Sequence, residues 1–401
     1  MDEFALIRRL TAQSGTIEKP ERGTADSAAG AMAASDSGVT VGIGDDAAVV
    51  RHRSGWELVL SCDAMVETVH FRPDTMRAAD VGFKAMASNI SDMAAMGAVP
   101  RYALVTLCKP PHIPVAWLEA LYNGLYECAS RYGVAIVGGD TTSTPGSFVV
   151  SVTVTGEVEA GRALLRSGAQ PGQAVFTTGY LGCSAAGLHG LLKQGRILEP
   201  ELWPATGEEA AGSKGLSQEE ALVDPIGGAG PEPGEAPAPA LHELIREHQR
   251  PLPQVEAGRL LAQSGLCGAL NDISDGLASE AWEIAEASGI GLVLEEASLP
   301  VHPGLAAYAL QAGLDPLDWI LYGGEDYQLV GTVLQEHADK LRELFEAAGL
   351  PFHLIGRTVE GPAALTLIRS DGRRQNVPKR GYNHFAGPAE VYRPASRGES
   401  E

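Results

Sequence analysis

The chain alternates short apolar runs with longer segments of helical spacing, and few folds accommodate that alternation. Residues 76–96 and 115–132 repeat apolar side chains at helical intervals and predict two helices. Leu58-Val59-Leu60 predicts a short buried strand that ends at Ser61-Cys62-Asp63. Further apolar runs predict strands at 102–107 and 134–137. The pattern indicates a fold that layers helices on a sheet.

A second series of the same kind follows a linker at residues 161–172. Just before the linker, residues 147–158 alternate for longer than usual, which predicts an antiparallel strand with one exposed face. Beyond the linker, the pattern predicts helices at 184–193, 253–264, 276–288, 303–321 and 335–348, and strands at 268–272, 291–295, 327–333 and 352–358. We therefore expect two α/β (α+β) domains, over residues 1–158 and 159–390, and a tail over 391–401.

Composition and charge narrow the functional class. The 401 residues carry 51 acidic and 30 basic side chains, a net charge of −21. Binding nucleic acid requires a surplus of Lys and Arg, so we expect no nucleic-acid partner. No apolar run approaches the ~20 residues of a membrane-spanning helix, and the acidic start is unlike a signal peptide. The five cysteines form no C-x-x-C pair, which favours reduced thiols. We therefore expect a cytoplasmic protein without a membrane partner.

Two segments have compositions typical of insertions. Residues 18–39 are small and polar and show no period. Residues 199–240 hold nine acidic residues against the single Lys214, together with seven Pro and seven Gly. Such a segment buries too little apolar surface to offset its ordering entropy, so we expect a solvated, mobile loop there.

Carboxylates recur at the ends of predicted strands and at helix boundaries, and many are flanked by Gly or Ser. They are Asp45-Asp46, Asp63, Asp92, Asp140, Asp272, Asp275 and Glu325-Asp326. Strand ends and the loops after them are where α/β folds build their sites. Glycine lets a backbone approach a ligand closely, and exposed amides there can hold phosphate oxygens.

Carboxylates in this arrangement suit Mg²⁺, which takes oxygen ligands and shares them with phosphates. For any one of them, such as Asp275 before a helix, a capping role is a sufficient explanation. Their recurrence favours a cluster, and the mutual repulsion of clustered carboxylates implies bound cations.

Two segments come close to familiar phosphate-binding motifs, but neither is a true match. Residues 42–47 match G-x-G-x-x-A formally, but two acids stand where a pyrophosphate would bind, and a strand follows instead of a helix. Residues 207–214 come close to a P-loop, but Ser213 separates the Gly-Lys pair. If ATP binds, it does so without a Walker loop.

Two basic side chains remain open to two interpretations. His70 lies seven residues after Asp63, and a lone histidine is more often structural than functional. The Arg166 guanidinium can donate two hydrogen bonds to one phosphate group, but a role in an interdomain ion pair would explain an arginine at this position comparably well.

Taken together, these motifs resemble thiamine-monophosphate kinases. The segments that carry the resemblance run in order between about residues 4 and 387: Gly42–Ala48, Ser61–Asp63, His70-Phe71, Asn89–Gly97, Gly138–Thr142, Gly161–Ala163, Asp272–Leu277, Gly323–Tyr327 and Gly381–Phe385. The resemblance implies ATP-dependent transfer of the γ-phosphoryl group to thiamine phosphate, which gives thiamine diphosphate. It also implies the two-domain fold of aminoimidazole ribonucleotide synthetase, in which N-terminal domains pair through their sheets to form a homodimer.

The resemblance further implies roles for individual residues. The magnesium-binding positions would be Asp46, Ser61, Cys62, Asp63, Asp92, Asp140, Asp272 and Asp275. The positions that touch ATP would be Tyr122, Gly139, Asp140, Arg166 and Ser274, and those near thiamine phosphate His70, Glu325 and Tyr382. The acceptor is already an ionised phosphate, so we expect no covalent residue or general base. Metal ions on Asp63, Asp92 and Asp140 would carry the chemistry by offsetting phosphate repulsion.

One position departs from the family pattern. Many members have Thr where this chain has Cys62, and a thiol is a poor ligand for Mg²⁺, so we expect Cys62 to bind through its backbone carbonyl. The related selenophosphate synthetase and hydrogenase-maturation proteins are disfavoured, because no cysteine precedes Cys62 or follows Cys267. A non-catalytic dimer that senses metal or nucleotide is the alternative from another class, and an assay of ATP turnover with thiamine phosphate distinguishes the two.

Overall fold

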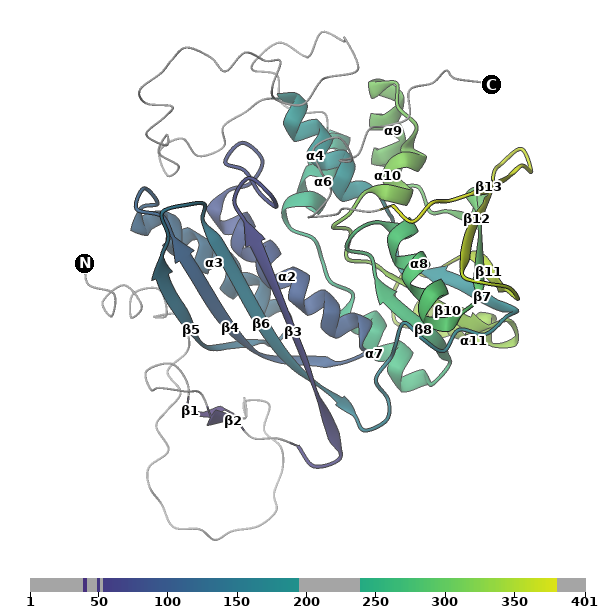
Figure 1. Cartoon of the computed structure of the whole chain (residues 1–401), viewed down its shortest axis with the longest axis horizontal. Coiled ribbons are helices and arrows are strands. Elements are labelled where there is room, and N and C mark those ends of the chain that lie inside the picture. The colour runs from purple at the N-terminus through teal and green to yellow at the C-terminus, as the bar shows by residue number, and fades with distance from the viewer. Residues whose placement is uncertain (1–38, 42–48, 51–52, 195–238, 381–401) are drawn as a thin grey trace.

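Each half of the chain builds its own sheet, as the sequence predicts (Figure 1). The computed structural model describes residues 39–41, 49–50, 53–194 and 239–380. The short strands β1 (Val39–Val41) and β2 (Val49–Val50) pair antiparallel with each other.

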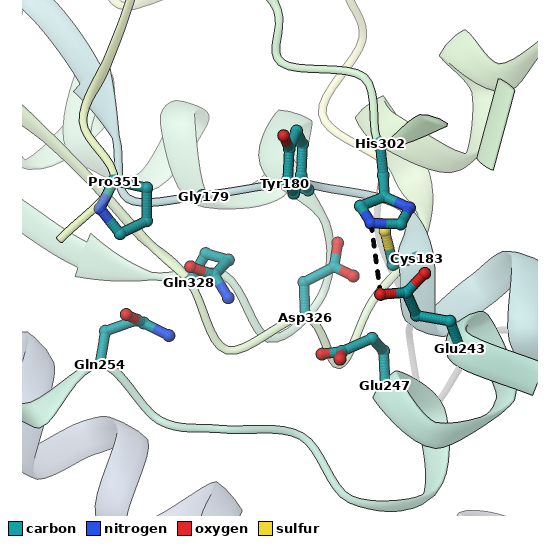
Figure 2. Close-up of a pocket in the computed structure, with 10 residues that line it drawn as sticks. All are labelled: Gly179, Tyr180, Cys183, Glu243, Glu247, Gln254, His302, Asp326, Gln328 and Pro351. Atoms are coloured by element: carbon teal, nitrogen blue, oxygen red, sulfur yellow. Dashed lines mark ion pairs between the residues drawn. The ribbon is translucent and has the colours of Figure 1, made fainter. Parts of the chain in front are cut away.

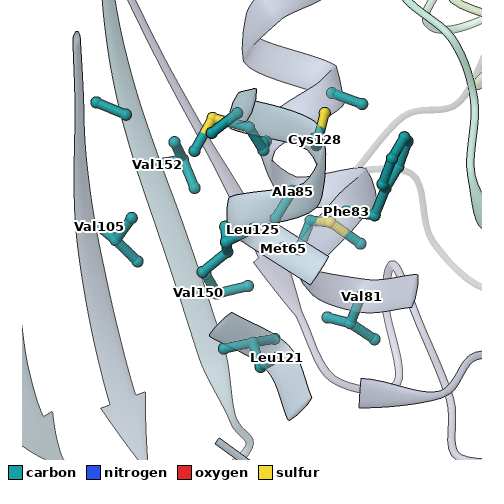
Figure 3. Packing of buried hydrophobic residues seen from close by; sticks show 14 of the residues in the cluster. Met65, Val81, Phe83, Ala85, Val105, Leu121, Leu125, Cys128, Val150 and Val152 are labelled. Carbon is teal, nitrogen blue, oxygen red and sulfur yellow. The ribbon is translucent and has the colours of Figure 1, made fainter. Parts of the chain in front are cut away.

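The N-terminal sheet has four strands in the order β3-β6-β4-β5, with only β4 and β5 parallel. The strands are β3 (Trp56–Val66), β4 (Val99–Lys109), β5 (Ala135–Ser143) and β6 (Val149–Glu159). The helices α2 (Ala78–Ala95) and α3 (Val115–Arg131) cover one face of this sheet (Figure 1). Their apolar side chains meet those of the strands in a single core (Figure 3), which includes Val81, Phe83, Val105, Leu121, Leu125, Val150 and Val152.

Two glycines allow α2 and α3 to pack in direct backbone contact. A Cβ atom at Gly82 would lie 1.9 Å from the Leu121 carbonyl oxygen, and one at Gly124 would lie 1.8 Å from the Ala79 carbonyl oxygen. No larger residue fits at these positions without separating the helices.

The prediction of a short buried strand at 58–60 is wrong in two respects. Strand β3 has 11 residues and continues through Asp63, so that acid lies inside the strand. The side chains of Leu58 and Leu60 are 54% and 64% exposed. They lie on the face of the sheet opposite α2 and α3, which no described element covers (Figure 1). We refer to this surface as the open face.

The C-terminal sheet has seven strands in the order β13-β12-β9-β11-β7-β10-β8, antiparallel except for β12 and β9. The strands are β7 (Gln173–Thr177), β8 (Cys267–Asp272), β9 (Gly291–Glu295), β10 (Leu329–Leu334), β11 (His353–Val359), β12 (Ala364–Ile368) and β13 (Arg374–Asn376). The α-helices are α4 (Cys183–Gln194), α6 (Pro239–Gln249), α7 (Val255–Ser264), α8 (Leu277–Ser288), α9 (Pro303–Ala312), α10 (Pro316–Tyr322) and α11 (Ala338–Ala347), and two 3₁₀ turns are η1 (Glu296–Ser298) and η2 (Gln335–His337).

Helices cover both faces of this sheet. Val175 of β7 belongs to a core formed with α4, α8, α9 and α10, whereas its neighbour Phe176 belongs to a core formed with α7 and α11. The helices and strands predicted from residue 184 onward are present with ends within three residues of those predicted, apart from the helical segment 303–321, which is divided into α9 and α10. Elements that the sequence did not predict include β7, α6, β12 and β13.

The two domains meet along α2. A Cβ atom at Gly258 of α7 would lie 2.1 Å from the Ala94 carbonyl oxygen, so these two helices also touch through their backbones. Arg259 of α7 donates to Glu159 at the end of β6 (Nη2–Oε1 2.6 Å). Helix α2 is therefore shared by the cores of both domains.

Candidate active site

One face of α2 is polar although the helix is buried almost throughout. Its members are Lys84, Ser88, Asn89, Ser91 and Asp92, which we call the polar stripe of α2. Residues three and four apart in a helix share a face, so these side chains project in the same general direction. Each of them contacts a residue that the sequence assigned to the site.

Strand β3 faces the polar stripe with Ser61 and Asp63, which lie two residues apart and so share a face of the sheet. The Ser61 hydroxyl donates a hydrogen bond to the Asp92 carboxylate. The Asp63 N–H donates to Asn89 Oδ1 (2.9 Å). These contacts hold the predicted metal ligands of the N-terminal domain next to one another.

The C-terminal domain adds Asp272, the last residue of β8. The Ser91 hydroxyl donates to Asp272 Oδ2 over 2.6 Å and so connects the two domains. Carboxylates from β3, α2 and β8 therefore converge at the boundary between the domains, and we call Asp63, Asp92 and Asp272 the acidic cluster.

Each carboxyl of the acidic cluster has a raised pKa. Burial, followed by the charges of Asp272 and Asp63, raises the pKa of Asp92 to about 7. Burial raises the pKa of Asp272 to about 6, against the opposing effects of Ser91 and Arg166. Burial also raises the pKa of Asp63, although a hydrogen bond from Ser88 lowers it. Desolvated carboxylates that repel one another are the environment that a bound cation stabilises.

The donor set of this region is all oxygen, from carboxylates and serine hydroxyls, which fits Mg²⁺ and not a soft metal. Within the described ranges, no group of three or more His, Cys, Asp or Glu side chains already converges tightly enough to hold a metal ion. The predicted ligand Asp46 and the predicted substrate residue Tyr382 lie outside the described residues.

Arg166 lies close enough to the acidic cluster to lower the pKa of both Asp92 and Asp272. Its Nε donates to Asn271 Oδ1 (2.9 Å), and its Nη1 pairs with Glu283 (2.8 Å). The guanidinium is thus fixed at the edge of the cluster.

Buried Glu280 connects Asn271 to the loop that follows β8. Its Oε2 accepts from Asn271 Nδ2 (2.5 Å), and its Oε1 accepts from the Ser274 hydroxyl (3.4 Å) and the Asp275 N–H (3.2 Å). Burial, followed by the charge of Asp272, raises the pKa of Glu280 to about 9. This carboxyl orders the predicted ATP residue Ser274 and the predicted metal ligand Asp275 together.

Glu325 lies in a strained loop beside the cluster. Its φ is 65° and that of Tyr327 is 49°, a region that residues other than glycine rarely adopt. The Glu325 N–H donates to the Ser274 carbonyl (2.7 Å), and the Glu325 carboxylate pairs with Lys84 Nζ (2.5 Å). Burial, followed by the charges of Glu325 and the acidic cluster, raises the pKa of Tyr327 well above its ordinary value. The Tyr327 phenol therefore stays neutral beside these carboxylates.

Asp140 does not join the acidic cluster within one chain. The sheet register places Asp63 in a row with Val152 and Val105, which are buried against the helices. Asp140 lies opposite Thr106, the residue after Val105 on β4. Because successive residues of a strand point to opposite faces, the Asp140 side chain lies on the open face.

Cys62 also presents its side chain to the open face, where Sγ lies 3.5 Å from Ser151 Oγ. The thiol therefore points away from the acidic cluster, as expected if any metal contact of this residue is made by the backbone. Gly139, which precedes Asp140 on β5, has no room for a side chain, because a Cβ atom there would lie 1.8 Å from the Val105 carbonyl oxygen.

The two remaining predicted residues are Tyr122 and His70. Tyr122 lies in the core against Tyr126, with a ring separation of 6.0 Å, and burial raises its pKa above the ordinary value. His70 follows the end of β3, and its Nδ1 accepts from the Val66 N–H (3.0 Å), which is a structural role for that nitrogen.

A cavity of about 340 Å³ opens in the C-terminal domain (Figure 2). Its lining is Gly179, Tyr180, Cys183, Glu243, Glu247, Gln254, His302, Asp326, Gln328 and Pro351. Asp326 Oδ2 accepts from the Gly182 N–H (2.6 Å), and burial raises the pKa of Asp326 to about 7. The cavity adjoins the Glu325 loop through Asp326 but contains no member of the acidic cluster.

Sequence reasoning missed Lys84, His248 and Glu280. Lys84 carried a signal, because it is the single charge in the apolar stretch 81–87 of a predicted helix. His248 and Glu280 carried none, since each is followed or preceded by ordinary polar helix residues.

Comparison with known proteins decides the family. Two family models match: AIR synthase related protein, N-terminal domain, over residues 44–158, and AIR synthase related protein, C-terminal domain, over residues 205–367. The thiamine-monophosphate kinase of Bacillus subtilis (strain 168) is 37% identical over 387 residues, covering 96% of this chain and 100% of that protein. The chain belongs to the thiamine-monophosphate kinase family.

Solved structures agree with this assignment. The thiamine-monophosphate kinase of Stenotrophomonas maltophilia K279a superimposes with a TM-score of 0.69 at 31% identity, covering 93% of this chain and 98% of that chain. AaThiL complexed with AMPPCP and TMP superimposes with a TM-score of 0.64 at 29% identity, covering 84% and 89% of the two chains. The predicted two-domain fold of a single chain and the predicted family are thus both confirmed.

Proposed function

We propose that this chain transfers the γ-phosphoryl group of ATP to thiamine phosphate and so produces thiamine diphosphate. The observation that carries the proposal is the convergence of Asp63, Asp92 and Asp272, from both domains, beside the Arg166 guanidinium. Membership of the thiamine-monophosphate kinase family supports the kinase activity. The AaThiL complex with the ATP analogue AMPPCP and TMP supports ATP and thiamine phosphate as the two substrates.

Several Mg²⁺ ions are part of the proposal, since the oxygen donors of the acidic cluster suit that ion. Their ligands would come from Asp46, Ser61, Cys62, Asp63, Asp92, Asp140, Asp272 and Asp275. When bound, Mg²⁺ neutralises the charges that keep two phosphate groups apart. The carboxylates hold that charge in place, and Arg166 offers a planar set of N–H donors to phosphate oxygens.

The protein's own contribution to the chemistry is positioning. Thiamine phosphate is already an anion, so no side chain has to remove a proton from it before it attacks. Phosphoryl transfer requires the attacking and leaving oxygens to lie in line. We propose that Ser274 and Arg166 orient ATP, with Gly139, Asp140 and Tyr122 completing that site, while His70, Glu325 and Tyr382 orient thiamine phosphate.

A homodimer is also part of the proposal, and the open face supports it. Leu58, Leu60 and Leu104 are 54%, 64% and 42% exposed on this one surface. Several exposed apolar side chains on one sheet face are typical of an interface. Pairing two open faces would bury these leucines and would bring Asp140 next to the partner subunit.

Within the described ranges, the longest helices are too short or too polar to cross a bilayer. The cytoplasmic location expected from the sequence stays a prediction.

The activity is tested by incubating the purified chain with ATP, MgCl₂ and thiamine phosphate and separating the products by chromatography. We expect ATP-dependent formation of thiamine diphosphate, and none when thiamine replaces thiamine phosphate. Binding of ATP without any thiamine diphosphate would instead favour the non-catalytic sensing dimer.

A further inference from the structure

Lys84 is a charged residue in an apolar setting. Its side chain has 0% exposure, and its Nζ lies 2.5 Å from Glu325 Oε2 on the other domain. An unpaired ammonium in such a setting is strongly unfavourable, and removing one partner of a buried ion pair leaves the other uncompensated. Glu325 is therefore the counter-ion that allows Lys84 to be buried.

His248 contacts both members of this pair but carries no positive charge of its own. Its Nδ1 lies 3.4 Å from Glu325 Oε2, 3.5 Å from Lys84 Nζ and 3.1 Å from Ser184 Oγ. Burial and the charge of Lys84 hold the pKa of His248 well below its ordinary value, so the ring is neutral. Lys84 is therefore the cationic partner of Glu325: burial lowers the pKa of its ammonium group, and the Glu325 carboxylate raises it.

Among the described residues, the Glu325 carboxylate is held on one side only. Both basic contacts are made to Oε2, and the side chain remains 28% exposed. The backbone beneath it is held by two hydrogen bonds to the loop after β8, from the Glu325 N–H to Ser274 O (2.7 Å) and from the Tyr327 N–H to Ile273 O (2.9 Å). One carboxylate oxygen is thus fixed by the protein, while the exposed part of the group is available to a ligand.

We propose that Lys84 is a positioning residue for thiamine phosphate: it fixes Oε2 of Glu325 so that the rest of the carboxylate is presented to the substrate's cationic ring system. This inference rests on the proposed function. Lys84 cannot touch the substrate itself, because none of its side chain is exposed, so its effect passes through Glu325. A charge-assisted hydrogen bond is strong enough to hold a carboxylate in one orientation.

The same helix then sets a distance within the site. Lys84 and Asp92 are eight residues apart on the polar stripe, about 12 Å along the axis at ~1.5 Å per residue. Helix α2 thereby fixes the spacing between the group that meets the organic end of the substrate and the acids that serve its phosphate.

The test compares Lys84→Met with a matched control, Lys340→Met, which removes an exposed lysine of α11. Lys84→Met should raise the Michaelis constant for thiamine phosphate about tenfold, since a charged hydrogen bond is worth roughly that factor. The Michaelis constant for ATP should change less than twofold, and Lys340→Met should change neither. Calorimetric titration with thiamine phosphate should show the same loss of affinity without turnover.

A double variant identifies the route of the effect. If Lys84 acts through Glu325, adding Lys84→Met to Glu325→Gln should cause less than a further twofold loss of affinity for thiamine phosphate. Full multiplication of the two losses would overturn the proposal, and so would equal rises for both substrates or unchanged affinity in folded Lys84→Met. If Lys84→Met does not fold, Lys84→Gln keeps a donor without the charge, and the same criteria apply to it. Absence of thiamine diphosphate formation by the wild-type chain would reject the proposed function, a result separate from any of these.

Discussion

Asp63, Asp92 and Asp272 come from three elements and two domains, yet burial, helped by the charge of Asp63, raises the pKa of both Asp92 and Asp272. Three acids with raised pKa values are unfavourable neighbours unless a cation compensates their charge. At the scale of single residues, the candidate site is thus recognisable by the uncompensated negative charge of its neighbouring carboxylates.

Asp63→Asn tests whether these acids hold Mg²⁺. The change keeps size and hydrogen-bonding capacity but removes a negative charge, so turnover should fall by about 10²–10³, as when a major electrostatic stabiliser is lost. Excess Mg²⁺ should restore part of the activity by mass action. Exposed Asp339, paired with Arg342 on α11, provides the control Asp339→Asn. Normal turnover of Asp63→Asn together with a lower melting temperature would assign Asp63 a structural role.

Asp326 predicts a pH dependence of stability. Its pKa is raised from 3.8 to about 7 by burial, so the folded state keeps a proton that the unfolded state has already released. The corresponding stability is present below about pH 4 and is lost as pH rises to about 7.

Asp326→Asn should remove this dependence. Between pH 5 and 7.5 the wild-type chain should lose about 3 kcal/mol relative to the variant, at ~1.4 kcal/mol per pH unit. Denaturant unfolding at the two pH values measures the difference. An equal gap between wild type and variant at both values would contradict a raised pKa for Asp326.

The sequence indicated single site residues better than it indicated their partners. Asp272 and Ser274 could be predicted because a short apolar strand ends directly before them. Lys84 and Glu325 are 241 residues apart, and no local pattern predicts that two such groups will meet. The face of Asp140 could not be predicted either, because it depends on the register of β5 against β4.

At the scale of elements, the close packing of α2 on α3 depends on two glycines as well as on the apolar side chains between the helices. Glycine inside a helix is unfavourable by ~1 kcal/mol relative to alanine, so its presence at Gly82 and Gly124 requires a reason. The reason is the contact of each with a backbone carbonyl of the other helix.

Gly82→Ala should therefore destabilise the chain despite the better helix propensity of alanine. Overpacking of this kind costs about 1–3 kcal/mol, and a lower denaturation midpoint would show it. Gly146→Ala is the control, because a Cβ atom there lies at an ordinary 3.7 Å from Thr144 Oγ1. A Gly82→Ala variant as stable as the control would mean that α2 and α3 can separate freely.

Elements with little pattern of their own were the ones the sequence failed to predict. All five residues of β7 are buried, so the strand shows no alternation. Helix α6 begins at Pro239, inside the Pro-rich segment whose composition predicted an insertion as far as residue 240. Packing against neighbouring helices and strands, and not a local sequence pattern, accounts for both elements.

At the scale of the whole molecule, the open face predicts self-association. Leu60→Arg places a charge on this face and should convert a dimer into a monomer, as measured by sedimentation equilibrium at micromolar concentration. Leu310 is 85% exposed on α9, away from this face, so Leu310→Arg is the matched control. A wild-type chain that is monomeric and fully active would refute the dimer.

The acidic segment between α4 and α6 should be dispensable for turnover. A Cβ atom at Gly187 would lie 2.2 Å from Leu244 O, and one at Gly190 would lie 2.4 Å from Leu241 Cδ1, so α4 and α6 run antiparallel. The ends at Gln194 and Pro239 therefore lie on the same side, and a short Gly/Ser linker can replace residues 199–236. Turnover should stay within a few-fold of wild type, whereas a selective loss of thiamine phosphate binding would show that the segment is a lid.

The sharing of α2 between the two domains has a consequence during synthesis. When the ribosome has completed β6 at Glu159, the emerging chain holds Asp63 and Asp92 but none of Arg166, Asp272 and Ser274. The polar stripe then lacks both Asp272 and Glu325, which arrive only with the second domain. Under the proposed function, an incomplete chain therefore lacks an assembled phosphoryl-transfer site, and we expect truncated products not to hydrolyse ATP.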